Sequence, residues 1–117
     1  MTDDQWSLLR STHEVQAMGE ELRLSDAAGT TTPEQERKYL LRRAALAQRH
    51  LAAASTIGCD PKDARQDADM TANRLWKHDA LHGTHCGPLP AKHPDWKASN
   101  IYGYVRQEAD AAGLNPC

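Results

Sequence analysis

The sequence predicts an all-α fold, a small four-helix bundle-like domain, from three observations. Apolar residues recur at spacings of three and four, the period of an amphipathic helix. Capping residues and prolines precede these stretches and glycines follow them, as they do at the ends of helices. No stretch shows the polar and apolar alternation of a half-buried strand. The whole chain, residues 1–117, is expected to form a single domain.

The most strongly marked helix lies between Thr32 and Gly58, and the rest of the chain is expected to pack around it. Thr32 is a good N-cap, Pro33 suits the first helical position, and Gln35 would complete a capping box. Gly58 is expected to end the helix. Its apolar stripe comprises Leu40, Leu41, Ala44, Ala45, Ala47, Leu51, Ala54 and Ile57.

A preceding helix is expected to run from Asp3 or Asp4 to about Asp26, with acidic residues in its first turn, where the helix dipole favours them. The short linker, residues 27–32, predicts that these first two helices form a hairpin. The apolar stripe of the first helix comprises Leu8, Val15, Met18 and Leu22, flanked by Trp6 and Leu9.

A third helix is expected to begin at Pro61, with Asp60 as its N-cap, and to end at His82 before Gly83. The segment that follows, up to Ser99, is rich in proline and glycine and is expected to be a loop. The third helix should bury Ala64, Ala68, Ala72 and Leu75, with Trp76 beside them.

The last helix is expected to be short, with Ser99 as its N-cap and its end before Gly113. Trp96, in the preceding loop, is expected to pack back onto the core, and residues 114–117 are expected to fray. The inward face of this helix comprises Ile101, Val105, Ala109 and Ala112, flanked by Tyr102 and Tyr104.

The composition predicts a thin core. Alanine accounts for 18 residues, whereas leucine, isoleucine and valine together account for 16 and phenylalanine is absent. Large side chains that bury much apolar area are therefore scarce. Either alanine-lined helices pack very closely, or a partner completes the core, and we favour a homodimer.

Charge is distributed unevenly along a chain whose net charge is −2. Residues 1–30 carry six acidic and two basic residues, and residues 31–58 carry two acidic and five basic ones. The acidic first helix is therefore expected to lie antiparallel to the basic second one, or both faces to be solvated. If exposed, the basic face could bind a partner or nucleic acid without sequence specificity; it comprises Arg37, Lys38, Arg42, Arg43 and Arg49.

Three cysteines without a CxxC motif indicate reduced thiols and a cytoplasmic protein. No apolar run approaches the roughly 20 residues that a membrane span needs, and the first residues do not resemble a signal peptide.

The densest group of chemically versatile side chains lies in residues 78–93. His78 and His82 are four positions apart, so they share one helix face and could share a metal ion. His85 and Cys86 follow the break at Gly83 and could supply two more ligands. These four residues suffice for tetrahedral zinc, but the pattern is not specific, because the glutamate of metalloproteases does not follow the first histidine. The alternative to metal binding is that these residues are ordinary side chains of a helix end and a loop.

The junction of the second and third helices fits a helix-turn-helix in part, with Ala54 as the small residue and Gly58 in the turn. The would-be reading helix is acidic, however, and Asp67 falls where a core residue is expected. Nucleic-acid binding is therefore the third alternative.

No catalytic pattern is evident. The sequence contains no glycine-rich phosphate loop and no GxSxG elbow, and neither carboxylate pair, Glu20 and Glu21 or Asp67 and Asp69, has a spacing that places its two side chains together on a helix. We therefore expect a protein that is not an enzyme.

The C-terminal run YGYVRQE, residues 102–108, with Asp95 and Trp96 before it, resembles the ends of small uncharacterised actinobacterial proteins that are associated with mobile elements. The resemblance covers about a fifth of the chain and implies a setting but no activity.

The sequence thus favours a small non-enzymatic module that contacts another protein or itself and needs no cofactor. The first alternative is a zinc-binding protein.

Overall fold

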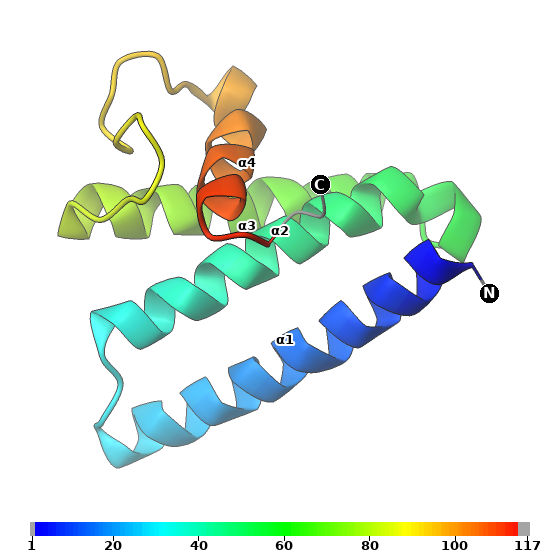
Figure 1. The fold of residues 1–117 in the computed structure, drawn as a ribbon, viewed down its shortest axis with the longest axis horizontal. Coiled ribbons are helices and arrows are strands. Elements are labelled where there is room, and N and C mark those ends of the chain that lie inside the picture. The colour runs from blue at the N-terminus through cyan, green and yellow to red at the C-terminus, as the bar shows by residue number, and fades with distance from the viewer. Residues whose placement is uncertain (1, 115–117) are drawn as a thin grey trace.

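The computed structural model describes residues 2–114, which form four α-helices and one short 3₁₀ helix without a strand (Figure 1). The all-α prediction is confirmed. The elements, in chain order, are α1 (Asp3–Ala28), α2 (Pro33–Ile57), α3 (Pro61–His82), η1 (Ala98–Asn100) and α4 (Ile101–Ala111).

Local capping explains where α1 begins and ends. The Thr2 hydroxyl accepts the Gln5 backbone N–H at 3.2 Å, and the Gln5 side chain accepts the Thr2 backbone N–H at 2.8 Å. This reciprocal pair is a capping box that we did not predict. At the other end, Gly29 adopts a left-handed conformation with φ of 71°, which glycine reaches without steric cost.

The start of α2 confirms Thr32 as N-cap and Pro33 in the first turn, because the Thr32 hydroxyl accepts the Gln35 N–H at 3.1 Å. The predicted capping box is wrong in its second half. Instead of returning to the cap, the Gln35 side chain donates to the Ser25 hydroxyl at 2.9 Å, across the α1–α2 linker. The Gln35 side chain therefore links α2 to α1 and does not cap its own helix.

Helices α2 and α3 form an antiparallel hairpin around the turn that follows Gly58 (Figure 1). Two ion pairs define its register: Arg43 with Asp67, near the turn, and Arg37 with Asp79, far from it. A helix-turn-helix instead joins its two helices at a steep angle. The predicted helix-turn-helix junction is therefore a helical hairpin whose helices pack along their length.

The core lies between α2, α3 and α4, and α4 crosses the α2–α3 pair (Figure 1). Small residues allow this close approach, since Ala44, Ala72 and Ala109 are almost completely buried. The predicted stripes are largely confirmed. Ile57 and Ala112 are exceptions that remain exposed at helix ends, and Trp6 and Leu9, which were predicted to flank the stripe of α1, are also exposed. Leu46 is buried against α1, a contact that we did not predict.

The last helix begins later than predicted. Ser99 lies inside η1, and the Asn100 side chain organises the turn by accepting the Lys97 N–H at 2.7 Å. Trp96 packs on the core, edge-on to Tyr104 with ring centres 5.4 Å apart, as expected. Leu114 was expected to fray, but it packs against the core; residues 115–117, including Cys117, lie outside the described part of the chain.

Within residues 2–114, no helix combines the length and the apolar character needed to cross a membrane.

Candidate functional site

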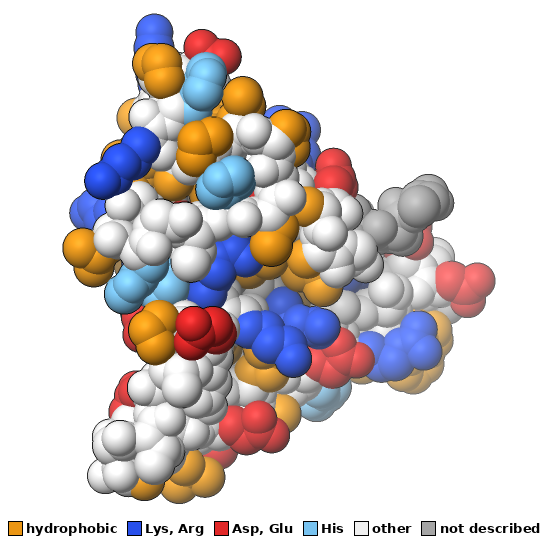
Figure 2. Space-filling view, turned by 60° about the vertical axis from the view of Figure 1, so that its left-hand side comes forward, with side chains coloured by type: hydrophobic (Ala, Val, Ile, Leu, Met, Phe, Trp, Pro, Cys, Tyr) orange, Lys and Arg blue, Asp and Glu red, His pale blue; other side chains and the backbone are white. Residues whose placement is uncertain are grey.

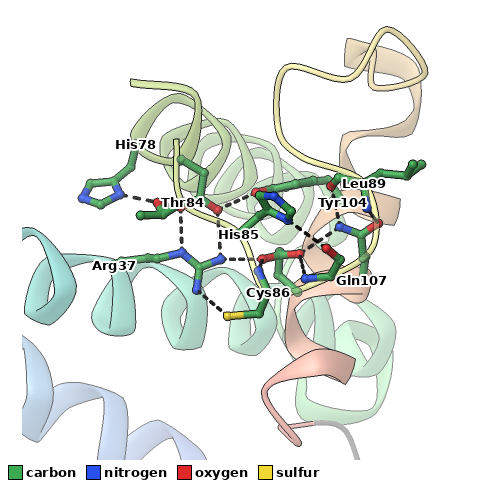
Figure 3. Close-up of polar contacts among 11 residues, drawn as sticks. Arg37, His78, Thr84, His85, Cys86, Leu89, Tyr104 and Gln107 are labelled. Carbon is green, nitrogen blue, oxygen red and sulfur yellow. Dashed lines mark hydrogen bonds and ion pairs between the residues drawn. The ribbon is translucent and has the colours of Figure 1, made fainter. Parts of the chain in front are cut away.

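A buried cluster of charged residues joins three helices and the 83–97 loop (Figure 3). Arg37 comes from α2, Asp79 from α3 and Glu108 from α4, and the two carboxylate side chains are fully buried. Each lies in the apolar stripe of its helix, three or four positions from a core residue. The sequence predicts that Arg37 belongs to an exposed basic face, which is wrong, and it assigns no role to Asp79 or Glu108. The stripe position was the signal that could have identified all three.

The Asp79 carboxylate accepts four hydrogen bonds. Arg37 Nε donates to Oδ1 at 2.7 Å and Arg37 Nη2 to Oδ2 at 3.0 Å, a bidentate pair. The Thr84 hydroxyl donates to Oδ1 at 2.8 Å and the Tyr104 hydroxyl to Oδ2 at 2.5 Å. Because a carboxylate has about four acceptor positions, the capacity of Asp79 is used up within the protein.

Glu108 is satisfied in the same way. Arg37 Nη2 donates to Oε1 at 2.5 Å, and the Cys86 backbone N–H donates to the same atom at 2.6 Å. The Gly87 N–H and the Gln107 side-chain amide each donate to Oε2 at 2.8 Å. The second negative charge of the cluster is thus stabilised by loop backbone, which fixes the loop to α4.

The protonation states of Arg37 and Tyr104 are set by this environment. Burial opposes the charge on Arg37, but the hydrogen bond to Asp79 and the charges of Asp79 and Glu108 outweigh it and raise the pKa. Burial and then the hydrogen bond to Asp79 raise the pKa of Tyr104. Arg37 therefore stays charged and Tyr104 neutral, so neither can act as a proton-accepting base near neutral pH.

The four predicted metal ligands do not converge. His78 is buried and the His82 ring lies beside it, with ring centres 4.4 Å apart. His85 is exposed and its Nδ1 lies 2.8 Å from the Gly87 carbonyl oxygen, whereas the Cys86 sulfur lies 3.8 Å from Arg37 Nη1. Among the described residues, no group of three or more His, Cys, Asp or Glu side chains could hold a metal ion.

His78 is unusual because neither ring nitrogen has a hydrogen-bond partner, although both are buried. Its Nδ1 lies 3.7 Å from Asp79 Oδ1, which is too far for a hydrogen bond (Figure 3). A buried imidazole without a hydrogen-bond partner is costly, so His78 has unused hydrogen-bonding capacity.

The basic residues of α2 do not form one exposed surface. Arg37 is in the buried cluster and Arg43 forms a bidentate pair with Asp67 of α3. Arg49 donates to the Ser7 and Ser11 hydroxyls of α1, and Arg42 lies 3.8 Å from Glu14. Of the five, only Lys38 is exposed. The side of the molecule that Figure 2 shows carries acidic and basic side chains next to each other.

Helix α1 forms the second candidate site, because among the described elements it packs against α2 alone (Figure 1). Its buried residues are Leu8 and Val15. Three apolar side chains on the same helix remain exposed: Trp6 by 51%, Leu9 by 38% and Leu24 by 55%. Apolar residues therefore occupy both the inward and the outward face of α1.

Two hollows flank the contact between α1 and α2. One, of about 280 Å³, lies on the side of Gly113 and Leu114; the other, of about 320 Å³, lies on the side of Asp67 and α3. The seam between them is narrow and is formed around Val15 and Leu46. Helix α1 thus contacts the rest of the protein through one narrow seam and is not packed on several sides.

The chain matches no family model, and neither the curated proteins nor the solved structures yield a significant match to it.

Proposed function

We propose that this protein is a non-enzymatic interaction module whose outward α1 face binds another protein. The observation that carries the proposal is that α1 exposes Trp6 and Leu24 on the side away from α2, which is its only neighbour among the described elements. A helix with apolar residues on both sides is typical of a helix between two packed layers. Here α2 supplies one layer, and a partner supplies the other.

The buried charge cluster supports a structural rather than a catalytic role. Both of its carboxylates accept four hydrogen bonds from within the chain, which leaves little capacity for a substrate. Its geometry ties α2, α3, α4 and the loop into one rigid body. That body includes α2 and therefore supplies a fixed surface on which α1 packs, as a binding surface requires.

Site-specific photocrosslinking in native cells tests the proposal. A photoreactive residue replaces Leu24 on the outward α1 face, and a matched control replaces Leu81, which is more exposed at 80% but lies on α3. We expect a defined crosslinked species from position 24 that Trp6→Ala abolishes, and none from position 81. Equal crosslinking at both positions, or none at position 24, would contradict the proposal.

A second candidate function is metal binding at His78 and His82. The supporting observation is the buried His78 ring, which has no hydrogen-bond partner on either nitrogen and lies beside the His82 ring. Two histidines on adjacent helical turns can bind zinc with water or further ligands completing the shell. Recruitment of His85 or Cys86 would require the loop to rearrange.

Equilibrium dialysis of untagged protein against zinc tests this second candidate. One equivalent should bind, and the double variant His78→Gln/His82→Gln should lose it, whereas the loop variant His93→Gln should bind as wild type does. Binding that survives the double variant would exclude this site.

We also propose a cytoplasmic location, because Cys59 and Cys86 are exposed free thiols, which persist in reducing compartments. Thiol labelling immediately after cell lysis should modify both. Recovery of the cysteines as disulfides would contradict this location.

A further inference from the structure

The outward face of α1 carries a pattern of apolar and charged residues that would match the same face of a second copy running in the opposite direction. Trp6 and Leu24 lie on the same side of the helix, because they are separated by about five helical turns. Arg10 lies between them near Trp6, and Glu20 and Glu21 lie between them near Leu24. All five side chains are exposed. The face therefore presents an apolar side chain near each end, with a positive charge next to Trp6 and two negative charges next to Leu24.

We propose that a second copy of this chain occupies this face, with the two α1 helices antiparallel about a two-fold axis that passes near the level of Val15. In this register Trp6 of each copy lies opposite Leu24 of the other. Arg10 of each copy lies at the level of Glu20 and Glu21 of the other, on the flank of the face that carries Glu21. This inference rests on the proposed function and names the partner of the α1 face.

Charge decides the direction of the pairing. A parallel arrangement would place Arg10 against Arg10 and the glutamates against glutamates, and like charges in direct apposition are unfavourable. The antiparallel arrangement converts each of these contacts into an oppositely charged pair. It also opposes the dipoles of the two helices, whose N-terminal ends carry partial positive charge.

The charged side chains on this face are available to form ion pairs with a second copy. Arg10 makes no ion pair or side-chain hydrogen bond among the described residues, and Glu21 makes none either. Glu20 pairs with Arg23 of the same helix, but both side chains are mostly exposed, so this contact can rearrange at little cost.

A closed two-fold dimer would also add apolar burial to a chain whose own core is rich in alanine. Each copy buries few large side chains within its own fold. An α1–α1 contact would bury Trp6 and Leu24 of both copies. The assembly stops at a dimer, because the two-fold contact occupies the α1 face of both copies and leaves none to bind a third chain.

Sedimentation velocity of the purified full-length protein over a range of concentrations is the first test. Wild-type protein should show a reversible monomer–dimer equilibrium. The double variant Trp6→Ala/Leu24→Ala should raise the dimer dissociation constant by more than about tenfold, because each substitution acts twice in a two-fold interface. The control Met70→Ala/Leu81→Ala removes exposed apolar side chains from α3 and should leave the constant unchanged.

Charge reversal is the second test, and it does not depend on apolar packing. Arg10→Glu alone and Glu20→Arg/Glu21→Arg together should each weaken the dimer. The triple variant, which combines them, should restore it. The control Arg74→Glu changes an exposed charge on α3 and should have no effect. Circular dichroism of each variant verifies the helical content.

Three results would overturn the dimer proposal: a wild-type monomer at every concentration, a dimer that the α1 variants do not weaken, or a triple variant that fails to restore association. The proposed function fails separately. If position 24 crosslinks to a different protein while the purified chain is monomeric, the α1 face is a binding site for that protein, and only the second-copy assignment is wrong.

Discussion

At the scale of single residues, the most consequential contacts are those of Arg37, Asp79 and Glu108. Their hydrogen bonds are satisfied, yet burying three charges offers little net stability compared with apolar packing. We infer that their effect is on specificity, because both carboxylates are satisfied only when α2, α3 and α4 bring Arg37, Asp79 and Glu108 together. Removing one member leaves the others charged and buried, which is far more costly than losing an exposed pair.

Asp79→Ala should therefore lower the free energy of unfolding by about 3–5 kcal/mol, since Arg37 would lose its bidentate partner. The comparison is Asp67→Ala, which breaks the Arg43 pair, where both side chains are about 30% exposed. That variant should lose only about 0–1 kcal/mol. Urea denaturation at neutral pH measures both. Equal losses would mean that the cluster does not contribute as a buried network.

His50 should make stability depend on pH. Burial, and then the positive charge of Arg43, lower the pKa of His50 below that of an unfolded histidine. The unfolded chain therefore takes up more protons as the pH falls below about 6.5, and the folded state loses stability on acidification. The neutral ring is held by Thr12, whose hydroxyl lies 3.2 Å from His50 Nε2.

The measurement is the unfolding free energy of wild type and His50→Gln between pH 7.5 and pH 5. The variant should flatten the curve on the acidic side of about 6.5, whereas the exposed-residue control His13→Gln should leave it as steep as in wild type. An unchanged slope in His50→Gln would refute the assignment.

At the scale of the elements, helix ends are determined by short-range bonds. Thr2, Thr32 and Asp60 each use a side-chain oxygen to accept a backbone N–H of the first turn, and Gly29, Gly58 and Gly83 close the three long helices with positive φ. These bonds involve residues within a few positions of each other, so they could be predicted in part from sequence alone. Helix α4 departs from this pattern because its start depends on the preceding loop.

Thr32→Ala should lower the unfolding free energy by about 1 kcal/mol, because the Gln35 N–H loses its acceptor. Thr32→Ser keeps the hydroxyl and should remain close to wild type. Thr56→Ala, an exposed threonine near the end of the same helix, serves as the control for the loss of a methyl and a hydroxyl group. Thermal melting ranks the three variants, and a serine variant as unstable as the alanine variant would argue against the cap.

At the scale of the whole molecule, the protein is a compact body of α2, α3 and α4 to which α1 is attached. The α1 seam consists of a small apolar cluster around Leu8, Val15 and Leu46, with hydrogen bonds from Arg49. Elements with few buried contacts open at lower free energy than the core. Helix α1 should therefore be the least protected of the long helices.

Deletion of residues 1–31 should leave a folded α2–α4 body, since neither the main core nor the charge cluster includes an α1 residue. Circular dichroism should show cooperative melting of the shortened chain, and hydrogen exchange of the intact monomeric protein should show faster exchange in α1 than in α3. A shortened chain that is unfolded would mean that the Leu46 contact is essential for the fold.

Sequence alone determined the helices of this protein and most of their ends, because amphipathic period and capping act over a few residues. It also identified the stripes that form the core. It did not reveal that Arg37, Asp79 and Glu108 meet, or that His85 and Cys86 lie apart from the two helical histidines. Those outcomes depend on how α2, α3 and α4 pack, and α1 retains an open outward face because tertiary packing gives it a single neighbour. Only the tertiary structure could decide them, since each joins residues from separate elements, whose relative placement no local pattern specifies.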